Sequence, residues 1–90
     1  MEYVVYCLYS ERFDKLYIGQ TESLIQRFYS HNKLSMDSYT RSYRPWKVIY
    51  VEFCDSRANA LRREKQLKTG KGRDWLRNSQ LTLMKTIEFI

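Results

Sequence analysis

The chain has 90 residues, of which 43% are hydrophobic and 29% are charged, and its formal net charge is +6. These values indicate one domain with a single modest core, and they exclude a disordered tail. The positive excess favours a polyanionic partner, of which nucleic acid is the commonest, although it also fits a small protein that is merely soluble.

The cysteine and histidine content limits the kinds of site and compartment. Cys7 and Cys54 each lie in an apolar, strand-like run, far apart and without a CxxC motif, so we expect buried thiols in a reducing compartment. His31 is the sole histidine, too few for a zinc site. No apolar run reaches the roughly 20 residues of a membrane span, and the first residues show no secretion signal. We therefore expect a cytoplasmic protein without membrane contact.

The chain begins with two runs of β-branched and aromatic residues that predict strands over residues 3–9 and 16–20, joined by a polar turn. Side chains alternate between the two faces of a strand, so Tyr17 and Gly19 share one face. If the hairpin register allows it, Tyr6 of the first strand points the same way.

A helix is predicted next, over about residues 22–32, with Thr21 as its N-cap and Glu22 in its first turn. A polar loop over residues 33–45 leads to a third strand over residues 46–53.

The second predicted helix starts at a cap formed by Asp55 or Ser56 and runs to about Thr69, where Gly70 ends it. A short further helix begins at Lys71.

The last segment, residues 81–90, fits a final helix better than a strand, and we treat it as an extension of a domain spanning residues 1–80. The element order is ββαβαα. Because strands joined by a short hairpin are antiparallel, the predicted fold is α+β, a small three-stranded antiparallel sheet flanked by helices.

One carboxylate falls on the buried stripe of the second predicted helix. Glu64 has Ala60, Leu61 and Leu67 as its neighbours one helical turn away, which are residues that a helix would bury. A desolvated carboxylate needs a partner, either an arginine or a metal ion. The structural alternative is an ion pair with Arg27 or with a neighbouring helix residue.

Arg27 and His31 lie one turn apart on the first predicted helix. An arginine in that position suits a phosphate or a carboxylate, and a salt bridge to Glu64 would satisfy it equally. His31 is a candidate general base, proton shuttle or phosphate contact, or a helix-end residue that caps carbonyls.

Tyr6 and Tyr17 are each weak evidence for a site, because the chain has eight tyrosines. Gly19 adds weight and is a candidate nucleic-acid contact, since a glycine weakens a strand unless it serves a bulge or a ligand that approaches the backbone closely. A phenol beside a phosphate and a metal-bound water can relay a proton.

A basic surface interleaved with aromatic residues is expected on the loop, the third strand and the second helix. Its cations are Arg41, Arg44, Lys47, Lys65, Lys68, Lys71 and Arg73. Tyr39, Tyr43 and Trp46 lie among the first three and suit stacking on bases, while the cations suit backbone phosphates. The alternative is a solvated charged face.

These motifs, in this order, resemble the GIY-YIG nuclease superfamily over residues 3 to about 77. The first motif reads Val4-Val5-Tyr6 in place of Gly-Ile-Tyr, and the second is intact as Tyr17-Ile18-Gly19. The superfamily arginine matches Arg27, and its metal-binding glutamate matches Glu64.

Within the superfamily the chain is similar to the small single-domain branch called UPF0213 or excision-nuclease-like. The shared motifs are His31-Asn32, Tyr39-Thr40-Arg41, Arg44-Pro45-Trp46-Lys47 and Arg63-Glu64-Lys65-Gln66-Leu67-Lys68.

The resemblance implies a metal-dependent endonuclease that hydrolyses phosphodiester bonds, in DNA repair or recombination. Glu64 would hold Mg²⁺ or Mn²⁺, and Tyr17 or Tyr6 would help to deprotonate the attacking water. Arg27 would stabilise charge on the phosphoryl oxygens, and His31 would assist proton transfer or contact the phosphate.

Besides the altered first motif, two further features differ from the usual superfamily pattern. Many members use an asparagine on the last helix, for which Asn78 is the nearby candidate. The nuclease module is also usually attached to a separate DNA-binding domain, so we expect affinity and specificity either to be weak or to come from a protein partner, with the chain a monomer or weak homodimer. The expected partner is nucleic acid, foremost DNA.

The alternatives to a nuclease are a basic nucleic-acid-binding module with little catalysis and a protein-interaction subunit of a repair complex.

Overall fold

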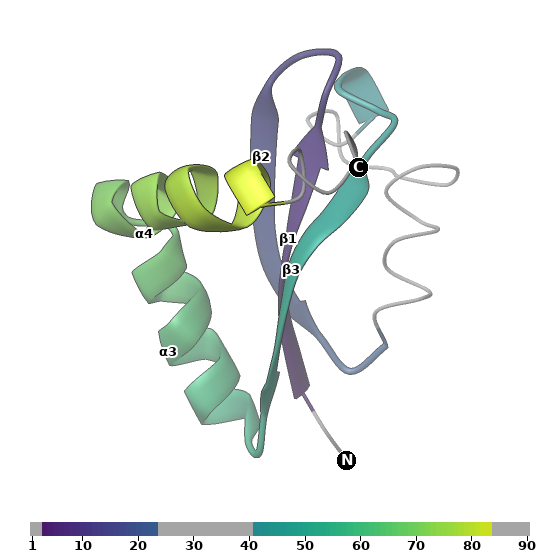
Figure 1. Ribbon diagram of the computed structural model, residues 1–90. Coiled ribbons are helices and arrows are strands. Elements are labelled where there is room, and N and C mark those ends of the chain that lie inside the picture. Colours follow the sequence, from purple (N-terminus) through teal and green to yellow (C-terminus); the bar gives the residue numbers. More distant parts are fainter. Residues whose placement is uncertain (1–2, 24–40, 84–90) are drawn as a thin grey trace.

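The computed structural model describes residues 3–23 and 41–83, and a three-stranded sheet forms their centre (Figure 1). The strands are β1 (Tyr3–Ser10), β2 (Lys15–Thr21) and β3 (Lys47–Cys54), in the order β2-β1-β3. Both pairings are antiparallel. The expected α+β fold is therefore confirmed, and every strand boundary lies within one residue of its predicted position.

The turn between β1 and β2 is closed by Asp14, which adopts a left-handed backbone conformation with φ of 54°. Asp14 Oδ1 accepts hydrogen bonds from the hydroxyl of Tyr9 at 2.9 Å and from Nη1 of Arg77 at 2.8 Å. Aspartate tolerates this conformation better than most residues because its short polar side chain forms such local bonds. The turn is thereby tied to the helical end of the domain.

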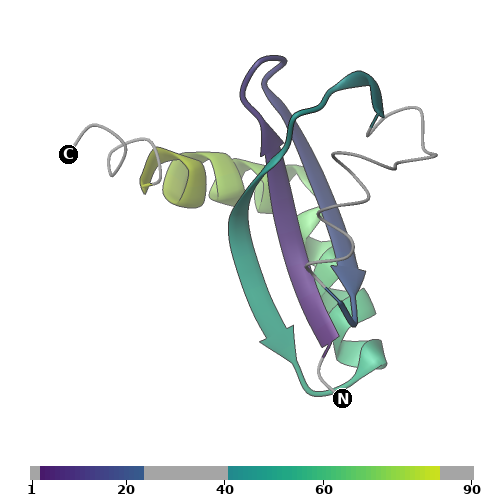
Figure 2. The ribbon, with the colours of Figure 1, turned by 90° about the vertical axis from the view of Figure 1, so that its right-hand side faces the viewer.

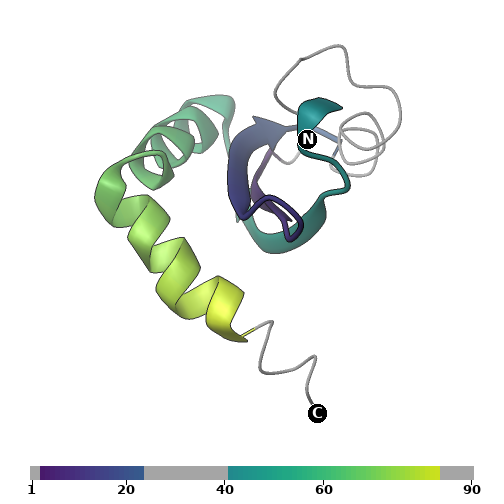
Figure 3. The same ribbon diagram turned by 90° about the horizontal axis from the view of Figure 1, so that it is seen from above.

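The helical part follows β3. Ser56 caps α3 (Arg57–Leu67) by accepting a hydrogen bond from the backbone N–H of Asn59. α4 (Gly70–Trp75) follows after two residues, and the chain continues into η2 (Leu76–Leu81), a stretch of π-helix. Figure 2 shows these helices behind the strands, and Figure 3 shows them from above as an angled layer along one side of the sheet.

Gly70 does not act as the helix stop that the sequence predicts. α3 ends at Leu67, and Gly70 is the first residue of α4. The hydroxyl of Thr69 accepts a hydrogen bond from the N–H of Gly72 at 3.1 Å, so Thr69 starts a new helix.

Two other predicted helices fall mostly outside the described residues. Thr21 belongs to β2 and its hydroxyl accepts from the N–H of Ser23 at 3.1 Å, and residues 22–23 are not helical, contrary to expectation. The remainder of the helix predicted to residue 32, and residues 84–90 of the predicted last helix, lie outside the described ranges. The boundary expected after residue 80 stays a prediction.

The sheet separates two clusters of buried side chains. On the helix-covered face, the buried residues are Val5, Cys7, Tyr9, Leu16, Ile18, Ala60, Leu67, Leu76 and Leu81. On the opposite face, the buried residues are Tyr6, Leu8 and Trp46, with Tyr17, Tyr43 and Val48 packed against them. We call these the helix-covered face and the tyrosine face.

The two cysteines are unpaired thiols, as expected, but they differ in burial. Cys7 is fully buried, whereas Cys54 is half-buried at the end of β3. Burial raises the pKa of the Cys7 thiol to about 12, so this thiol stays protonated and unreactive near neutral pH. No helix within the described ranges is long and apolar enough to cross a membrane.

Candidate active site on the tyrosine face

Tyr6 and Tyr17 lie on one face of the sheet, as the alternation pattern predicts. In the register of β1 and β2, Tyr6 is opposite Gly19 and Leu8 is opposite Tyr17. The two phenol rings are stacked, with centroids 6.4 Å apart and planes at 25°. Tyr6 is 1% exposed, whereas Tyr17 is half-buried at the surface of the face. Of the two phenols, Tyr17 is therefore the one whose side chain has exposed surface.

Gly19 is needed because the ring of Tyr6 lies over its backbone. A Cβ atom at position 19 would stand 2.6 Å from the Tyr6 hydroxyl oxygen and 2.8 Å from its Cζ, which is closer than van der Waals contact permits. The buried ring cannot move aside without disturbing the core. The close approach at this glycine is thus made by the Tyr6 ring and not by a bulge or a ligand, and contact of Gly19 with nucleic acid stays a prediction.

Trp46 supports Tyr17 and is buried, so its ring is not exposed for the stacking on bases that the sequence suggests. Its side chain is 2% exposed, and its ring meets that of Tyr17 edge to face, with centroids 6.1 Å apart. This arrangement orients the Tyr17 ring. Tyr43 is half-buried, and its ring packs edge to face on Phe13 of the hairpin turn.

Glu64 lies on α3 with 19% of its side chain exposed, and Lys68 Nζ pairs with its Oε1 at 3.0 Å. This ion pair is the neighbouring-helix-residue alternative that the sequence leaves open. Leu61 was expected on the same buried stripe but is 45% exposed, because the stripe is centred on Ala60 and Leu67. Lys68 is itself half-exposed, so the pair is weak.

The direction in which Glu64 projects follows from its neighbour Arg63. At 3.6 residues per turn, the two side chains leave the helix roughly 50° to either side of the buried stripe. Arg63 reaches Glu52 on β3, so Glu64 projects toward the opposite side of α3. Since α3 packs on all three strands and β2 is the far edge of the sheet, Glu64 faces the β2 edge, the strand that carries Tyr17.

The described residues fit a metal ion that is shared with a substrate better than one caged by protein. No group of three His, Cys, Asp or Glu side chains in residues 3–23 and 41–83 could enclose a metal. Mg²⁺ commonly binds one or two carboxylates and takes its other ligands from water and substrate phosphates. Glu64, a single partly desolvated carboxylate, suits that mode.

The predicted basic residues are divided between the two sides of the molecule. Arg41, Arg44 and Lys47 precede or begin β3, and Lys47 pairs with Glu11 of the hairpin turn at 2.8 Å. The others are exposed on the helical layer: Lys65, Lys68, Lys71 and Arg73. Arg73 Nε also donates to the backbone oxygen of Lys68 at 3.1 Å.

Arg27 and His31 lie outside the described residues, as does Tyr39. The structure therefore brings together Tyr6, Tyr17 and Gly19, and the roles of Arg27 and His31 stay predictions. Asn78 lies exposed on η2.

A second group of polar and aromatic side chains was not anticipated from the sequence. Arg63 Nε donates to both carboxylate oxygens of Glu52, at 3.0 and 3.1 Å, and Tyr50 donates to Oε1 of Glu52. The ring of Trp75 meets Tyr50 edge to face, with centroids 5.2 Å apart. In the sequence, Glu52 could have indicated this group, because it is a charged residue inside an apolar strand and alternation places it on the same face as Tyr50.

These bonds also affect the pKa values of the group. Burial would lower the pKa of Arg63, but its bonds to Tyr50 and Glu52 outweigh that and raise it. Burial and the bond to Glu52 raise the pKa of Tyr50. Arg63 therefore keeps its positive charge over the ordinary pH range.

Comparison with known proteins identifies the family of the chain. Residues 2–78 match the model of the GIY-YIG catalytic domain. The chain is 33% identical over 67 residues to the UPF0213 protein SSP2268 of Staphylococcus saprophyticus, covering 74% of this chain and 77% of that protein. It is 34% identical over 67 residues to the UPF0213 protein SH2523 of Staphylococcus haemolyticus, with the same coverage.

A solved structure shares the fold. The solution NMR structure of the UPF0213 protein BH0048 from Bacillus halodurans aligns with a TM-score of 0.53, covering 87% of this chain and 84% of that one at 24% identity. The sequence match spans both tyrosine-bearing strands and α3, and the fold that it implies is the one observed. The chain belongs to the GIY-YIG nuclease superfamily.

Proposed function

We propose that the protein is a metal-dependent endonuclease that hydrolyses phosphodiester bonds in nucleic acid, with Tyr17 as the group that accepts a proton from the attacking water. The observation that carries this assignment is the unequal exposure of the two stacked phenols. Tyr6 is 1% exposed and Tyr17 is half-buried at the surface. A general base must come within hydrogen-bond reach of the proton that it takes, and Tyr17 is the phenol that a substrate can reach.

The neighbours of Tyr17 act as positioning residues. Tyr6 stacks on it, Trp46 meets it edge to face, and Gly19 leaves the space that Tyr6 occupies. Together they restrict the rotation of the Tyr17 ring, so less entropy is lost when the hydroxyl meets a substrate.

Glu64 is the proposed ligand of Mg²⁺ or Mn²⁺. When bound, the ion would stabilise negative charge on the phosphate oxygens. The carboxylate is partly desolvated, and its half-exposed partner Lys68 is a weak competitor for it. Arg27 is proposed to stabilise the phosphoryl oxygens, and His31 to contact the phosphate or pass on a proton.

Membership in a nuclease superfamily implies a nucleic-acid substrate. We propose DNA as that substrate, repair or recombination in the cytoplasm as the setting, and a protein partner as a source of specificity. The alternative is a binding module with little catalysis, which the existing Glu64–Lys68 ion pair and the basic helical layer favour.

The test is incubation with labelled single-stranded, duplex and branched DNA, and with RNA, in Mg²⁺ or Mn²⁺. We expect cleavage by the wild type and its loss in Glu64→Ala, by about a thousandfold, because the metal ligand is removed. The matched control is Lys68→Met, which removes the ion-pair partner and is expected to cleave. Equal binding by all three proteins without metal-dependent cleavage would establish the binding module instead.

A further inference from the structure

The helical layer carries the whole positive excess of the chain. From Arg57 to Leu81 there are eight Lys and Arg side chains against two Asp and Glu, a net charge of +6 that equals the formal net charge of the entire chain. The remaining residues are neutral in sum. The strongest electrostatic attraction for a polyanion therefore lies on α3, α4 and η2, away from Tyr17.

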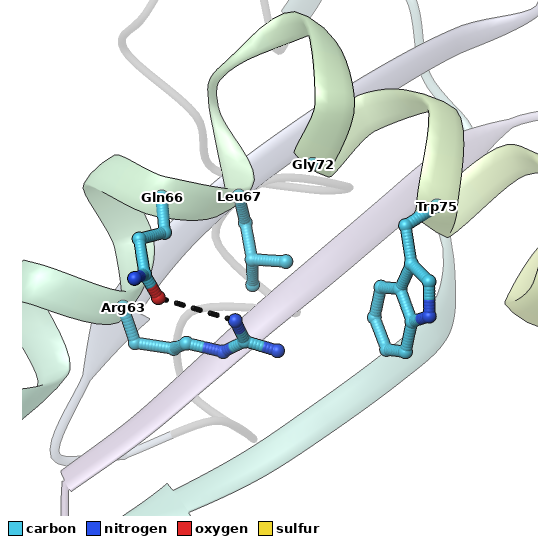
Figure 4. A pocket seen from close by; sticks show the side chains of 5 residues that line it. All are labelled: Arg63, Gln66, Leu67, Gly72 and Trp75. Carbon is cyan, nitrogen blue, oxygen red and sulfur yellow. Dashed lines mark hydrogen bonds between the residues drawn. The ribbon is translucent and has the colours of Figure 1, made fainter.

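This layer contains a pocket of about 210 Å³, lined by Arg63, Gln66, Leu67, Gly72 and Trp75. Figure 4 shows the Arg63 guanidinium pointing toward the indole of Trp75, with the Leu67 side chain next to the guanidinium. Leu67 is 2% exposed and forms an apolar base, whereas Trp75 is 40% exposed. The volume is below the usual range for drug-sized ligands and suits one planar ring system.

The side chains of the pocket are fixed before any ligand arrives. The Arg63 guanidinium is held by Glu52 and lies 5.8 Å from the centre of the Trp75 ring, and its Nη1 donates to Oε1 of Gln66 at 3.2 Å. The Trp75 ring also meets the Tyr50 ring edge to face, with the planes at 90°. A rigid, exposed indole between fixed polar groups binds with little further loss of side-chain entropy.

Gly72 explains how the pocket forms. A Cβ at this position would stand 2.4 Å from the backbone oxygen of Gln66 and 2.6 Å from Cα of Leu67. The glycine therefore lets the start of α4 pack directly on the end of α3, which brings Trp75 opposite Arg63.

We propose that this pocket binds one unpaired base of a single-stranded nucleic acid, whose phosphates lie on the cations of the helical layer. The base would stack on the exposed part of the Trp75 indole, with the N–H groups of Arg63 and Gln66 available to acceptors on its edge. A base within a duplex has its faces covered by its neighbours, so the site selects single-stranded segments. The proposal deepens the proposed function, since it adds a second contact to the same class of substrate.

The test measures binding without cleavage, in EDTA, to an oligothymidylate of about twelve nucleotides, a length within the usual site size for single-strand binders. Trp46→Phe leaves Trp75 as the sole tryptophan, and we expect its fluorescence to be quenched by the oligonucleotide. Trp75→Leu is expected to weaken binding about tenfold, whereas Trp75→Phe keeps an aromatic ring and most of the affinity. The matched control is Phe53→Leu, at an aromatic residue that is 69% exposed on β3, which is expected to bind as the wild type does.

Three results would overturn the proposal: no quenching of Trp75, equal binding by folded Trp75→Leu and wild type, or equal quenching by a blunt duplex of the same length. If Trp75→Leu does not fold, the proposal is tested by the quenching of Trp75 in Trp46→Phe and by its comparison between the oligothymidylate and the duplex. Tyr17→Phe separates this proposal from the proposed function, because it is expected to lose cleavage and keep quenching. If the oligonucleotide quenches Trp75 but neither the wild type nor any variant cleaves nucleic acid, the proposed nuclease function is wrong and the proposed base-binding pocket stands.

Discussion

The two faces of the sheet differ in what packs on them and in what they expose to solvent. On the tyrosine face, aromatic rings are packed around Gly19 so that one phenol, Tyr17, reaches the surface. On the helix-covered side, the apolar core is sealed by α3 to η2, and the charges lie on the outer surface of those helices. The comparison teaches that the proposed chemistry and the excess of positive charge lie on opposite sides of the described domain, and that Glu64 projects toward the β2 edge where the two sides meet.

The largest structural effect that we expect on the tyrosine face comes from Gly19→Ala. The added methyl group collides with the Tyr6 ring, so the free energy of unfolding falls by about 2–3 kcal/mol, and displacement of the ring pair also slows cleavage. Urea unfolding measures the first effect. Gly70→Ala is the control, because nothing lies within 4 Å of its added Cβ, and it is expected to stabilise the helix by up to about 1 kcal/mol. Equal effects of the two changes would contradict the packing argument.

On the helix-covered face, burial of Cys7 is expected to lower the free energy of unfolding at alkaline pH. Its pKa is raised from 9.0 to about 12 in the fold, so the unfolded chain loses this proton first, and stability falls as the pH rises from 9 toward 12. At a pH near 10.5 the loss is about 2 kcal/mol relative to pH 8. Tyr9 and Tyr50, whose pKa values are also raised, add in the same direction above pH 10.

The measurement is the urea midpoint at both pH values for the wild type and for Cys7→Ala. The variant is less stable because of its cavity, but it should lose less stability between the two pH values. A variant with the same pH dependence as the wild type would show that the thiol does not contribute.

Asp14 connects the hairpin turn to the helices, so its replacement tests how firmly the two sides are joined. Asp14→Ala loses the bonds to Tyr9 and Arg77 and puts alanine in a left-handed conformation, and we expect a loss of about 1–2 kcal/mol. Asp14→Asn keeps a hydrogen-bond acceptor, and asparagine tolerates the left-handed conformation, so its loss in the free energy of unfolding should be smaller than that of Asp14→Ala. Thermal unfolding measures the stability of both variants. A larger loss of stability in Asp14→Asn than in Asp14→Ala would contradict the proposed role of Asp14.

The smallest effect is expected at the exposed ion pair of Lys47 with Glu11. Both side chains are about half or more exposed, so Lys47→Gln should change the free energy of unfolding by less than about 0.5 kcal/mol. If Lys47 contacts a phosphate, the same variant has a smaller dependence of nucleic-acid binding on salt. Unchanged salt dependence would exclude that contact.

Residues with strong local patterns were predictable from the sequence. Alternation placed Tyr6 and Tyr17 on one face, and β-branched and aromatic runs located all three strands to within one residue. Ser56, one of two proposed caps, caps α3. These features depend on neighbours in the sequence or on period two, and they need no knowledge of long-range packing.

Features that depend on long-range packing were not predictable. Trp46 reads as a base-stacking aromatic among basic residues at the start of the third strand, yet the sheet buries it against Tyr17. Leu61 reads as part of a buried stripe, yet the position of α3 on the sheet leaves it exposed. The pocket at Trp75 requires α4 to turn back on α3 at Gly72, which a single sequence does not encode as a motif.

The most direct test of the assignment on the tyrosine face compares the cleavage rates of Tyr17→Phe and Tyr6→Phe on one DNA substrate in saturating Mg²⁺. Each change removes a single hydroxyl and keeps the ring stack. We predict that Tyr17→Phe slows cleavage by about a hundredfold or more with unchanged binding, as loss of a general base does, and that Tyr6→Phe slows it far less. A rate for Tyr17→Phe equal to that of the wild type, or a greater loss in Tyr6→Phe, would contradict the account.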